Sequence, residues 1–479
     1  MDFSTRFEKN LVYFIRKHDL IKANEKVLVA VSGGRDSMAL LHALSKVKKD
    51  FSISIVAVHM DHMLRNDSWK EKNVIAELAK RLGVKLISEK RNVPNFLKLN
   101  PNYSIEEAAR VVRYRYFLEK FEELKGDKIA LAHHRDDRIE NFFLMLFRGS
   151  GIHGLSSMRV KNFPFIRPLM FTDKSEITKY VEENSIPYIE DYTNYNIDFQ
   201  RNKLRLIFLP FIRERICKDI DKKIIRTVQI LEEYSEFVEE YSEGLFNILN
   251  LHEDQNMIVL DYSKLVKEHP VVISEILRMT FEKLKGDTKG LNFEKISKTI
   301  ELIKIKKVKN FEYNLGSSIR IFKSYDRLFF LKNYNLTLKG FNYKIDREGI
   351  YNIEEADTIL ELKVLNEFDF DKLRLSKEVV IFDYDKIKWP IFIRNRKAGD
   401  RIKPIGLKGH KKVKKVLNEM RIPRWLRNKV LVLQDSSGKI MWISGFRISE
   451  DFKVTQDTKR FLLLRIMRGG IFDNYEFKR

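Results

Sequence analysis

Cysteine is nearly absent from this sequence, because Cys217 is the only one among 479 residues. A single thiol cannot form an internal disulfide, and it cannot supply the cluster of thiolates that a zinc or iron–sulfur centre requires. Chemistry that needs paired thiols within the chain is therefore excluded.

Long apolar runs are lacking as well. No run reaches the roughly 18 residues that a membrane-spanning helix needs. Residues 1–20 also lack the charged and then apolar pattern of a secretion signal. We therefore expect a cytoplasmic protein with no membrane partner.

Negative charge is scarce in one part of the chain. The sequence has 90 Lys and Arg against 67 Asp and Glu, a net charge of +23, and residues 391–430 hold fourteen basic residues and only two acidic ones. A Lys-rich composition explains a high overall pI, but it does not explain this concentration. Because phosphates attract Lys and Arg, and binding them releases counterions, the segment favours a polyanion such as RNA as a partner.

The hydrophobic periodicity changes along the chain, which is too long for one core. The first two hundred residues alternate short apolar runs with amphipathic ones, which is typical of a doubly wound α/β fold with a parallel sheet. We expect strands at residues 26–31, 51–58, 84–88 and 128–132, and helices at 36–45, 68–82, 104–124, from near Asp136, at 218–250 and at 270–285. The predicted domains are a catalytic domain at 1–215, a mostly helical domain at 216–338, a linker with short strands at 339–389 and a small basic α/β domain at 390–479.

A glycine loop follows the first predicted strand. The strand runs directly into Ser32-Gly33-Gly34-Arg35-Asp36-Ser37 and then into a helix. The glycines let the backbone approach phosphate oxygens, and the start of the next helix points free N–H groups and its positive dipole end at them. Asp36 cannot bind phosphate by itself, so a carboxylate here favours a magnesium ion that bridges to phosphate.

Histidine and acidic residues follow the fourth predicted strand, in the run Ala132-His133-His134-Arg135-Asp136-Asp137-Arg138-Ile139-Glu140. Ligands of open α/β sheets lie beyond the carboxyl ends of the strands, so we expect this run at the same edge as the glycine loop. Asp137 and Glu140 are three residues apart and share a helix face. Carboxylates gathered opposite a triphosphate are costly unless magnesium or a substrate cation joins them. An acidic first turn favoured by the helix dipole explains one carboxylate, but not the paired histidines.

The loop pattern Ser-Gly-Gly-x-Asp-Ser differs from both the P-loop and the dinucleotide-binding pattern. It resembles the loop of the N-type ATP pyrophosphatases, the PP-loop family, which cleave ATP to AMP and pyrophosphate while adenylating a substrate oxygen. Further segments are similar to the tRNA(Ile)-lysidine synthases within that family. In the first 215 residues they are residues 59–65, 106–110, 113–114, 132–140, 148–151, 167–169, 190–194, 201–202 and Arg205. In the last 90 they are residues 397–401, 403–404, 409–415, 422–423 and 442–445.

The resemblance implies a two-step reaction on the wobble cytidine, position 34, of the isoleucine tRNA that carries the CAU anticodon. ATP adenylates the C2 oxygen of the base, and the side-chain amine of free L-lysine then attacks C2. The products are pyrophosphate, AMP and lysidine, so that AUA is read as isoleucine. ATP is then the co-substrate and Mg²⁺ the metal. A homodimer is as compatible with the resemblance as a monomer.

The resemblance and the motifs together give a set of expected site residues. The expected catalytic residues are Asp36, Asp137, Glu140 and Arg113, with Asp36 and Asp137 as metal ligands. The expected ATP-binding residues are Ser32, Gly33, Gly34, Arg35, Asp36 and Ser37. The expected contacts to lysine or tRNA are His133, Arg110, Arg205, Lys411, Lys412, Lys414 and Lys415. Asp137 and Glu140 would hold the lysine ammonium or take its proton. Asn141 departs from the family, which usually has threonine there.

Three other functions fit parts of the sequence. A PP-loop enzyme that thiolates tRNA would use pairs of cysteines, which this chain lacks. A synthetase that amidates a small molecule would need an ammonia source and has little use for the basic segment. A tRNA-binding protein with a decayed nucleotide site is the non-enzyme alternative. ATP–pyrophosphate exchange would separate the last alternative from an enzyme.

Overall fold

The computed structural model describes residues 2–64, 69–190, 197–305, 310–333, 340–356, 358–367, 378–407 and 409–469. Arg65, the predicted helix start at Ser68 and residues 191–194 of the motifs lie outside these residues. The chain forms two compact units, Met1–Phe237 and Val238–Arg479. In the part of the chain that the structure describes, no helix is long and apolar enough to span a bilayer.

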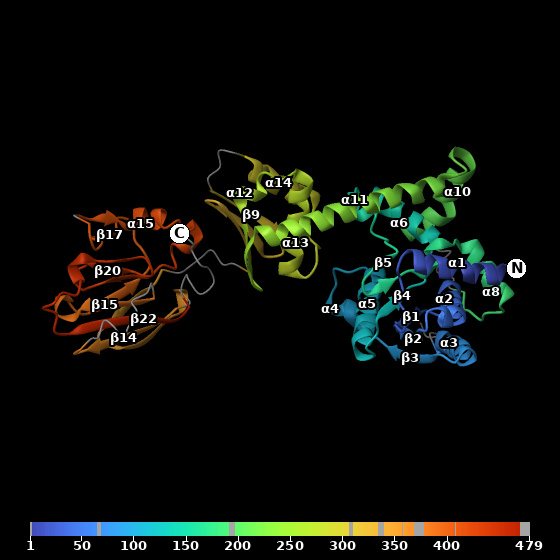
Figure 1. Cartoon of the computed structure of the whole chain (residues 1–479), viewed down its shortest axis with the longest axis horizontal. Coiled ribbons are helices and arrows are strands. Elements are labelled where there is room, and N and C mark those ends of the chain that lie inside the picture. The colour runs from blue at the N-terminus through green and yellow to red at the C-terminus, as the bar shows by residue number, and fades with distance from the viewer. Residues whose placement is uncertain are drawn as a thin grey trace. The chain divides into compact units, whose positions relative to one another are not determined.

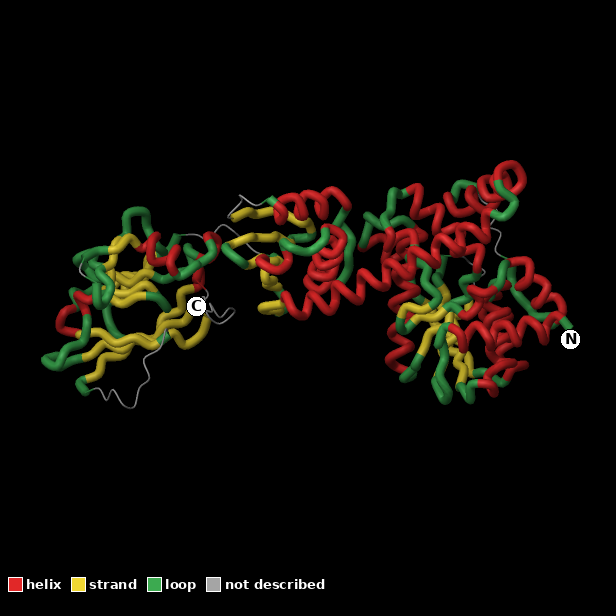
Figure 2. The backbone as a smooth tube through the Cα atoms, turned by 45° about the horizontal axis from the view of Figure 1, so that its top comes forward, coloured by secondary structure: helices red, strands yellow, loops and turns green. Residues whose placement is uncertain are grey.

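A six-stranded sheet in the order β3-β2-β1-β4-β6-β5 forms the centre of the first unit (Figures 1 and 2). Its strands are β1 (Lys26–Val31), β2 (Ser54–Asp61), β3 (Lys85–Lys90), β4 (Lys128–Ala130), β5 (Lys161–Asn162) and β6 (Phe165–Ile166). All neighbours pair in parallel except β5 and β6. The predicted α/β fold with a parallel sheet is confirmed.

Helices cover both faces of this sheet. They are α1 (Phe3–Lys17), α2 (Arg35–Val47), α3 (Trp69–Leu82), α4 (Val93–Leu99), α5 (Ile105–Glu123), α6 (Arg135–Phe147), α7 (Ile152–Leu155) and α8 (Lys174–Glu183). The apolar faces of α1, α2 and α8 share one core with β1, and α5 packs on the other face. The predicted capping box starts α5, because Ser104 and Glu107 each accept a hydrogen bond from the other's backbone N–H.

A helical segment leads out of the first unit. It contains α9 (Gln200–Lys203), α10 (Leu209–Phe211) and the 30-residue helix α11 (Ile220–Leu249). Ile224 and Val228 of α11 pack with Ile139 of α6. Phe246, near the other end of α11, belongs to the core of the second unit. One continuous helix therefore contributes to the cores of both units.

The second unit begins with helices packed on a five-stranded antiparallel sheet in the order β7-β8-β11-β10-β9. The strands are β7 (Asn250–Glu253), β8 (Met257–Asp261), β9 (Asn310–Gly316), β10 (Ile319–Ser324) and β11 (Arg327–Lys332). The helices are α12 (Tyr262–Leu265), α13 (Pro270–Lys285) and α14 (Phe293–Lys304). Residues 216–338, expected to be mostly helical, therefore also contain a five-stranded sheet.

The rest of the second unit is built from antiparallel strands and the short helix α15 (Val413–Glu419). The strands are β12 (Asn342–Ile345), β13 (Gly349–Ile353), β14 (Thr358–Leu365), β15 (Val379–Asp383), β16 (Ile391–Arg394), β17 (Arg401–Ile402), β18 (Lys411–Lys412), β19 (Val432–Gln434), β20 (Ile440–Ile443), β21 (Arg447–Ile448) and β22 (Phe461–Gly469). Strands β12 to β15 fall within residues 339–389, which were expected to be a linker with short strands. These strands belong to sheets that include later strands, because β14 pairs with β22 and β12 pairs with β16. Alternate side chains of β14 are buried, so the strands share one apolar core.

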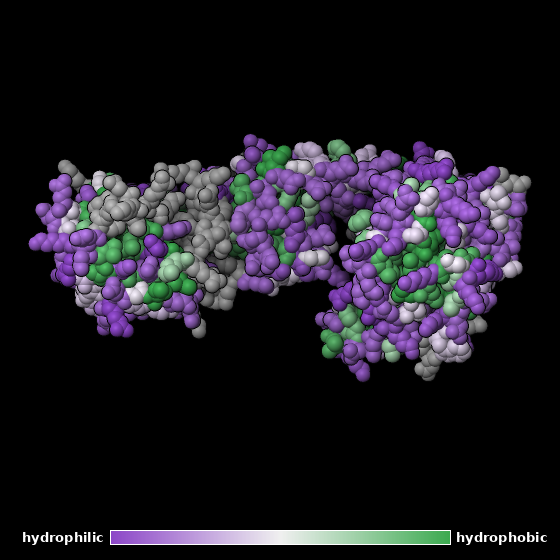
Figure 3. Space-filling model, turned by 60° about the horizontal axis from the view of Figure 1, so that its bottom comes forward, coloured by the Kyte–Doolittle hydropathy of each residue, from purple (hydrophilic) through white to green (hydrophobic). Residues whose placement is uncertain are grey.

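Charged residues make up 33% of the sequence, and hydrophilic side chains cover most of the face shown in Figure 3.

The domain boundaries proposed from the sequence stay a prediction.

Candidate active site

The glycine loop lies between β1 and α2. Gly33 has a φ of +82°, a conformation that favours glycine, and a Cβ added there would lie 3.3 Å from Cβ of Glu71. Ser37 Oγ accepts a hydrogen bond from Ser32 N at 3.1 Å and donates one to Gly34 O at 2.9 Å. No side chain caps Gly34, the residue before α2. The first N–H groups of α2 have no partner within the helix and are available to an anion.

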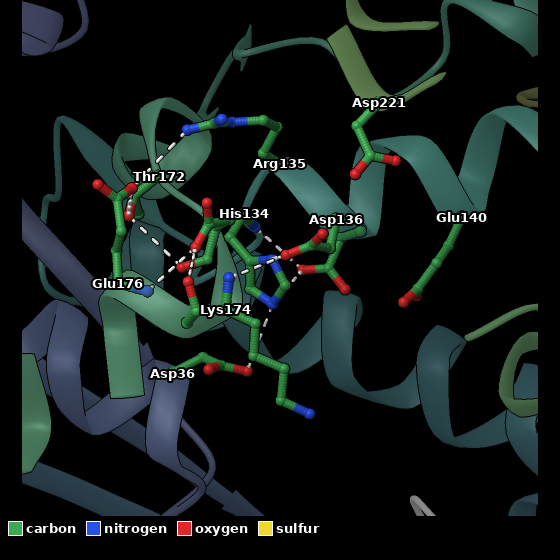
Figure 4. A network of polar contacts seen from close by, with 12 residues as sticks. Asp36, His134, Arg135, Asp136, Glu140, Thr172, Lys174, Glu176 and Asp221 are labelled. Atoms are coloured by element: carbon green, nitrogen blue, oxygen red, sulfur yellow. Dashed lines mark hydrogen bonds and ion pairs between the residues drawn. The ribbon is translucent and has the colours of Figure 1, made fainter. Parts of the chain in front are cut away.

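Two carboxylates from distant parts of the sequence meet at His134, and Figure 4 labels this histidine and one of the two, Asp36. Asp36 lies in the first turn of α2, and Asp137 in the first turn of α6. His134 Nε2 is 3.7 Å from Asp36 Oδ2 and 3.5 Å from Asp137 Oδ2. The sequence predicted that the two acidic residues come from the same sheet edge, and the structure brings them together.

Asp137 and Glu140 are buried and face two arginines from the helical segment after residue 199. Arg201 Nη2 donates to Asp137 Oδ1 at 2.7 Å, and its Nε donates to Glu140 Oε2 at 2.7 Å. Arg205 forms two hydrogen bonds with Glu140, at 2.6 and 2.9 Å. Two buried carboxylates and two partly exposed guanidinium groups therefore form one network.

The two aspartates differ in electrostatic environment. Burial raises the pKa of Asp36, and the charge of Asp137 raises it further, against the attraction of His134. Burial alone would also raise the pKa of Asp137, but His134 and Arg201 outweigh it and hold the pKa of Asp137 below its usual range. Asp137 is therefore a firmly ionised and weakly basic carboxylate.

The donor set around Asp36 fits a divalent cation. Asp36 Oδ1 is buried and has no hydrogen-bond partner. Within the described residues, no group of three or more His, Cys, Asp or Glu side chains is arranged to hold a metal. A magnesium ion at Asp36 and Asp137 would therefore complete its six oxygen ligands with phosphate and water, as Mg²⁺ commonly does.

His133 is positioned by Arg167, whose Nε donates to His133 Nδ1 at 3.2 Å. Nη1 of the same arginine donates to Arg159 O at 2.6 Å. Burial lowers the pKa of His133 to about 3, and the positive charge of Arg167 acts in the same direction, against Asp137. The imidazole is therefore neutral near neutral pH.

This pKa shift predicts a pH dependence of stability. An unfolded His133 gains a proton as the pH falls below 6.5, whereas the folded protein resists protonation until about pH 3. His133 should thus lower the stability of the folded state as the pH falls from 6.5 toward 3, and H133Q should remove that loss. Urea unfolding at pH 7 and pH 4.5 should show a smaller drop in unfolding free energy for H133Q than for the wild type. Equal drops would contradict the assignment.

Other predicted residues lie apart from this network. Arg35 donates to Thr178 and Tyr188, and its guanidinium lies over the Tyr188 ring. Arg110 and Arg113 are exposed on α5, with Arg110 over the ring of Tyr114.

The predicted tRNA-binding lysines lie in the second unit. Lys412, Lys414 and Lys415 are exposed, whereas Lys411 donates to Glu419 at 2.5 Å. Their side chains surround the start of α15, whose apolar residues are buried below them. The four lysines form a basic surface of the second unit.

A cavity of about 430 Å³ adjoins the acidic network on α6. It is lined by Arg135, Asp136, Ile139, Glu140, Asp173, Lys174, Ser175, Arg205, Leu209, Arg213 and Asp221. Figure 4 shows Asp136, Glu140, Lys174 and Asp221 around this region. Its lining of both charge signs suits a small zwitterion.

The sequence motifs predicted no separate role for His134 or Arg201. His134 directly precedes α6 and lies three residues before Asp137, so its position at a helix start was a usable signal. Arg201 and Arg205 are four residues apart, which places them on one helix face. That spacing could have identified them as a pair of partners for the carboxylates.

Comparisons with known proteins match both ends of the chain. Residues 3–212 match the PP-loop domain, and residues 391–464 match the TilS substrate C-terminal domain. The tRNA(Ile)-lysidine synthase of Clostridioides difficile is 30% identical over 452 residues, which cover 94% of this chain and 96% of that protein. Proteins of the same name from Caldanaerobacter subterraneus and Clostridium perfringens are 31% and 32% identical, and the matches cover 95% and 98% of those proteins.

These matches run over nearly the whole length of the relatives, and the PP-loop family implies the use of ATP. They also agree with the glycine loop and the paired carboxylates of the first unit. The chain belongs to the tRNA(Ile)-lysidine synthase family.

Proposed function

We propose that the protein ligates free lysine to C2 of cytidine 34 in the CAU anticodon of tRNA(Ile). The reaction consumes ATP, passes through an adenylated cytidine and gives lysidine, AMP and pyrophosphate. We place it in the cytoplasm, where tRNA and lysine are found. The observation that carries the proposal is the approach of Asp36 and Asp137 to the same imidazole, beside the glycine loop.

In the first step, the C2 oxygen of the cytidine attacks the α-phosphorus of ATP and pyrophosphate leaves. The uncapped N–H groups at the start of α2 would bind the leaving phosphates. Asp36 and Asp137 would hold Mg²⁺, which when bound neutralises the charge that develops on pyrophosphate. Ser32 and Ser37 keep the loop in this shape through the hydrogen bonds between them.

In the second step, the lysine ammonium would first lose a proton to Glu140 or to water. The free side-chain amine then attacks C2, and AMP leaves with the former C2 oxygen. Asp137 and Glu140 would attract the lysine ammonium. The lowered pKa of Asp137 makes it a poor proton acceptor, so binding the ammonium fits Asp137 better than removing its proton. Arg201 and Arg205 occupy the same carboxylates, so lysine binding would require the guanidinium groups to share them or move.

A cytidine in an anticodon loop is unpaired, so it can enter a pocket without opening a duplex. Arg110 and Arg113 are exposed and would contact the phosphates of the RNA or of ATP. These two roles, and a homodimer, stay predictions.

The proposal is tested with purified protein, ATP, labelled lysine and a tRNA(Ile) transcript that carries CAU. We expect label in the RNA that depends on ATP, and none in a transcript with uridine at position 34. Absence of label from the CAU transcript, under conditions in which ATP binds, would contradict the proposal.

The basic surface of the second unit should bind tRNA phosphates. We expect K411Q/K412Q/K414Q/K415Q to weaken tRNA binding and to reduce the slope of log affinity against log salt by roughly 2 to 3, because Lys411 is already paired with Glu419. Filter binding at several salt concentrations measures the slope. K46Q/K48Q/K49Q, on the first unit, is the matched control and should leave the slope unchanged. An unchanged slope in the quadruple variant would refute this assignment.

A thiolating PP-loop enzyme is the alternative within the family. Cys217 lies in the loop before α11, where its Sγ is 3.1 Å from Lys223 Nζ. It takes no part in the network of Asp36, Asp137 and Glu140. With a single thiol in the whole sequence, the chain has no pair of thiols to carry sulfur.

A further inference from the structure

A buried ion pair lies behind the carboxylates of α6. Arg138 follows Asp137 in the sequence. Arg138 and Glu140 are separated by about 200° around α6, so Arg138 points to the opposite side of the helix from Glu140. Its side chain is 5% exposed. A buried guanidinium needs a counter-charge, and Glu232 of α11 supplies it through an ion pair.

Glu232 is also largely removed from solvent. Its side chain is 14% exposed, and burial raises its pKa, although Arg138 opposes that shift. The same turn of α6 is held against α11 by apolar contacts, since Ile139 packs with Ile224 and Val228. The pair is therefore the polar part of a tight contact between α6 and α11.

A second connection runs from α11 to the site. Ser235, one turn after Glu232, accepts a hydrogen bond from Arg159 Nη2 at 3.0 Å. The carbonyl oxygen of Arg159 accepts from Arg167, and Arg167 donates to His133. Glu232 and Ser235 lie on one face of α11. Glu232 contacts Arg138, the residue after Asp137, and Ser235 is linked to His133 through Arg159 and Arg167.

We propose that Glu232 is a positioning residue for lysine transfer, which holds Arg138 and so sets the rotation of the α6 turn that presents Asp137 and Glu140. This inference rests on the proposed function. Glu232 touches neither the glycine loop nor Asp36, so ATP binding should not depend on it. Displacing a catalytic group by about 1 Å can cost on the order of a hundredfold in rate. The effect should therefore appear in the use of lysine.

The test compares full-length wild type, E232Q and E232D at a temperature where melting curves show all three to be folded. E232Q keeps the shape of the side chain and removes its charge. We expect kcat/KM for lysine to fall roughly tenfold to a hundredfold in E232Q, with ATP affinity within about twofold of the wild type. E232D keeps the charge and should retain more activity than E232Q.

E233Q is the matched control, because Glu233 is exposed on the same helix. It should behave as the wild type. If E232Q is fully folded and has wild-type kcat and KM for lysine, or if its losses in ATP binding and lysine use are equal, the positioning role is wrong. If the wild type itself adds no lysine to RNA, the proposed function fails first, so the two failures are distinguishable.

Discussion

Replacing Asp36 by asparagine should reduce lysidine formation by about 100-fold to 1,000-fold. Asp36 Oδ1 is buried without a partner, and the asparagine amide can replace neither the charge nor the second oxygen that a magnesium ion needs. The loss should shrink as magnesium is raised from about 1 to 20 mM, because a weaker site fills at higher concentration. Initial rates with labelled lysine at several magnesium concentrations measure both effects.

D50N is the control for D36N, since Asp50 is exposed at the far end of the same helical segment. It should keep wild-type activity. Asp36 also carries a raised pKa, so its neutral replacement should not destabilise the fold. A D36N protein with activity within about threefold of the wild type would show that Asp36 is not a metal ligand in the reaction.

The second large effect is expected for E140Q. Glu140 accepts three hydrogen bonds from Arg201 and Arg205. In E140Q the amide NH₂ would replace one of the accepting oxygens, so N–H donors of the glutamine and of an arginine would face each other. We expect a loss of about 2 to 4 kcal/mol in unfolding free energy, toward the lower end because the arginines are 32% and 22% exposed. Lysine use should fall by about 100-fold.

Chemical unfolding and lysine kinetics measure these two effects of E140Q separately. E214Q is the control, because Glu214 is exposed in the same helical segment. If E140Q keeps the wild-type KM for lysine at a temperature where it is folded, Glu140 has a structural role only.

The parallel sheet of the first unit was predictable because its signals are local. Strand β1 matches its expected bounds, and the capping box fixes the start of α5 where Ser104 and Glu107 indicated. Strand β2 runs from Ser54 to Asp61, three residues later than expected. Apolar periodicity marks the centre of a strand better than its ends.

The partners of the site residues were less predictable. Asp36 and Asp137 follow different strands, and the rule that ligands gather at one sheet edge was enough to place them together. Arg201 and Arg205 come from a later helical segment, so their pairing with Glu140 depends on tertiary packing. The contact between Arg138 and Glu232 depends on α11 returning to α6, which periodicity does not show.

The segment before the basic domain shows a different limit. Residues 339–389 were expected to be a linker with short strands, but β14 alternates buried and less buried residues and pairs with β22, about one hundred residues later. Pairing between strands so distant in sequence leaves little local signal.

The central claim is a two-step transfer through an adenylated cytidine, and α-labelled ATP tests it most directly. In the absence of lysine, label should enter the CAU transcript. After lysine is added, the label should leave the RNA as AMP, in step with the attachment of one lysine for each AMP released. Release of labelled AMP without prior labelling of the RNA, or lysine attachment without AMP, would contradict the account.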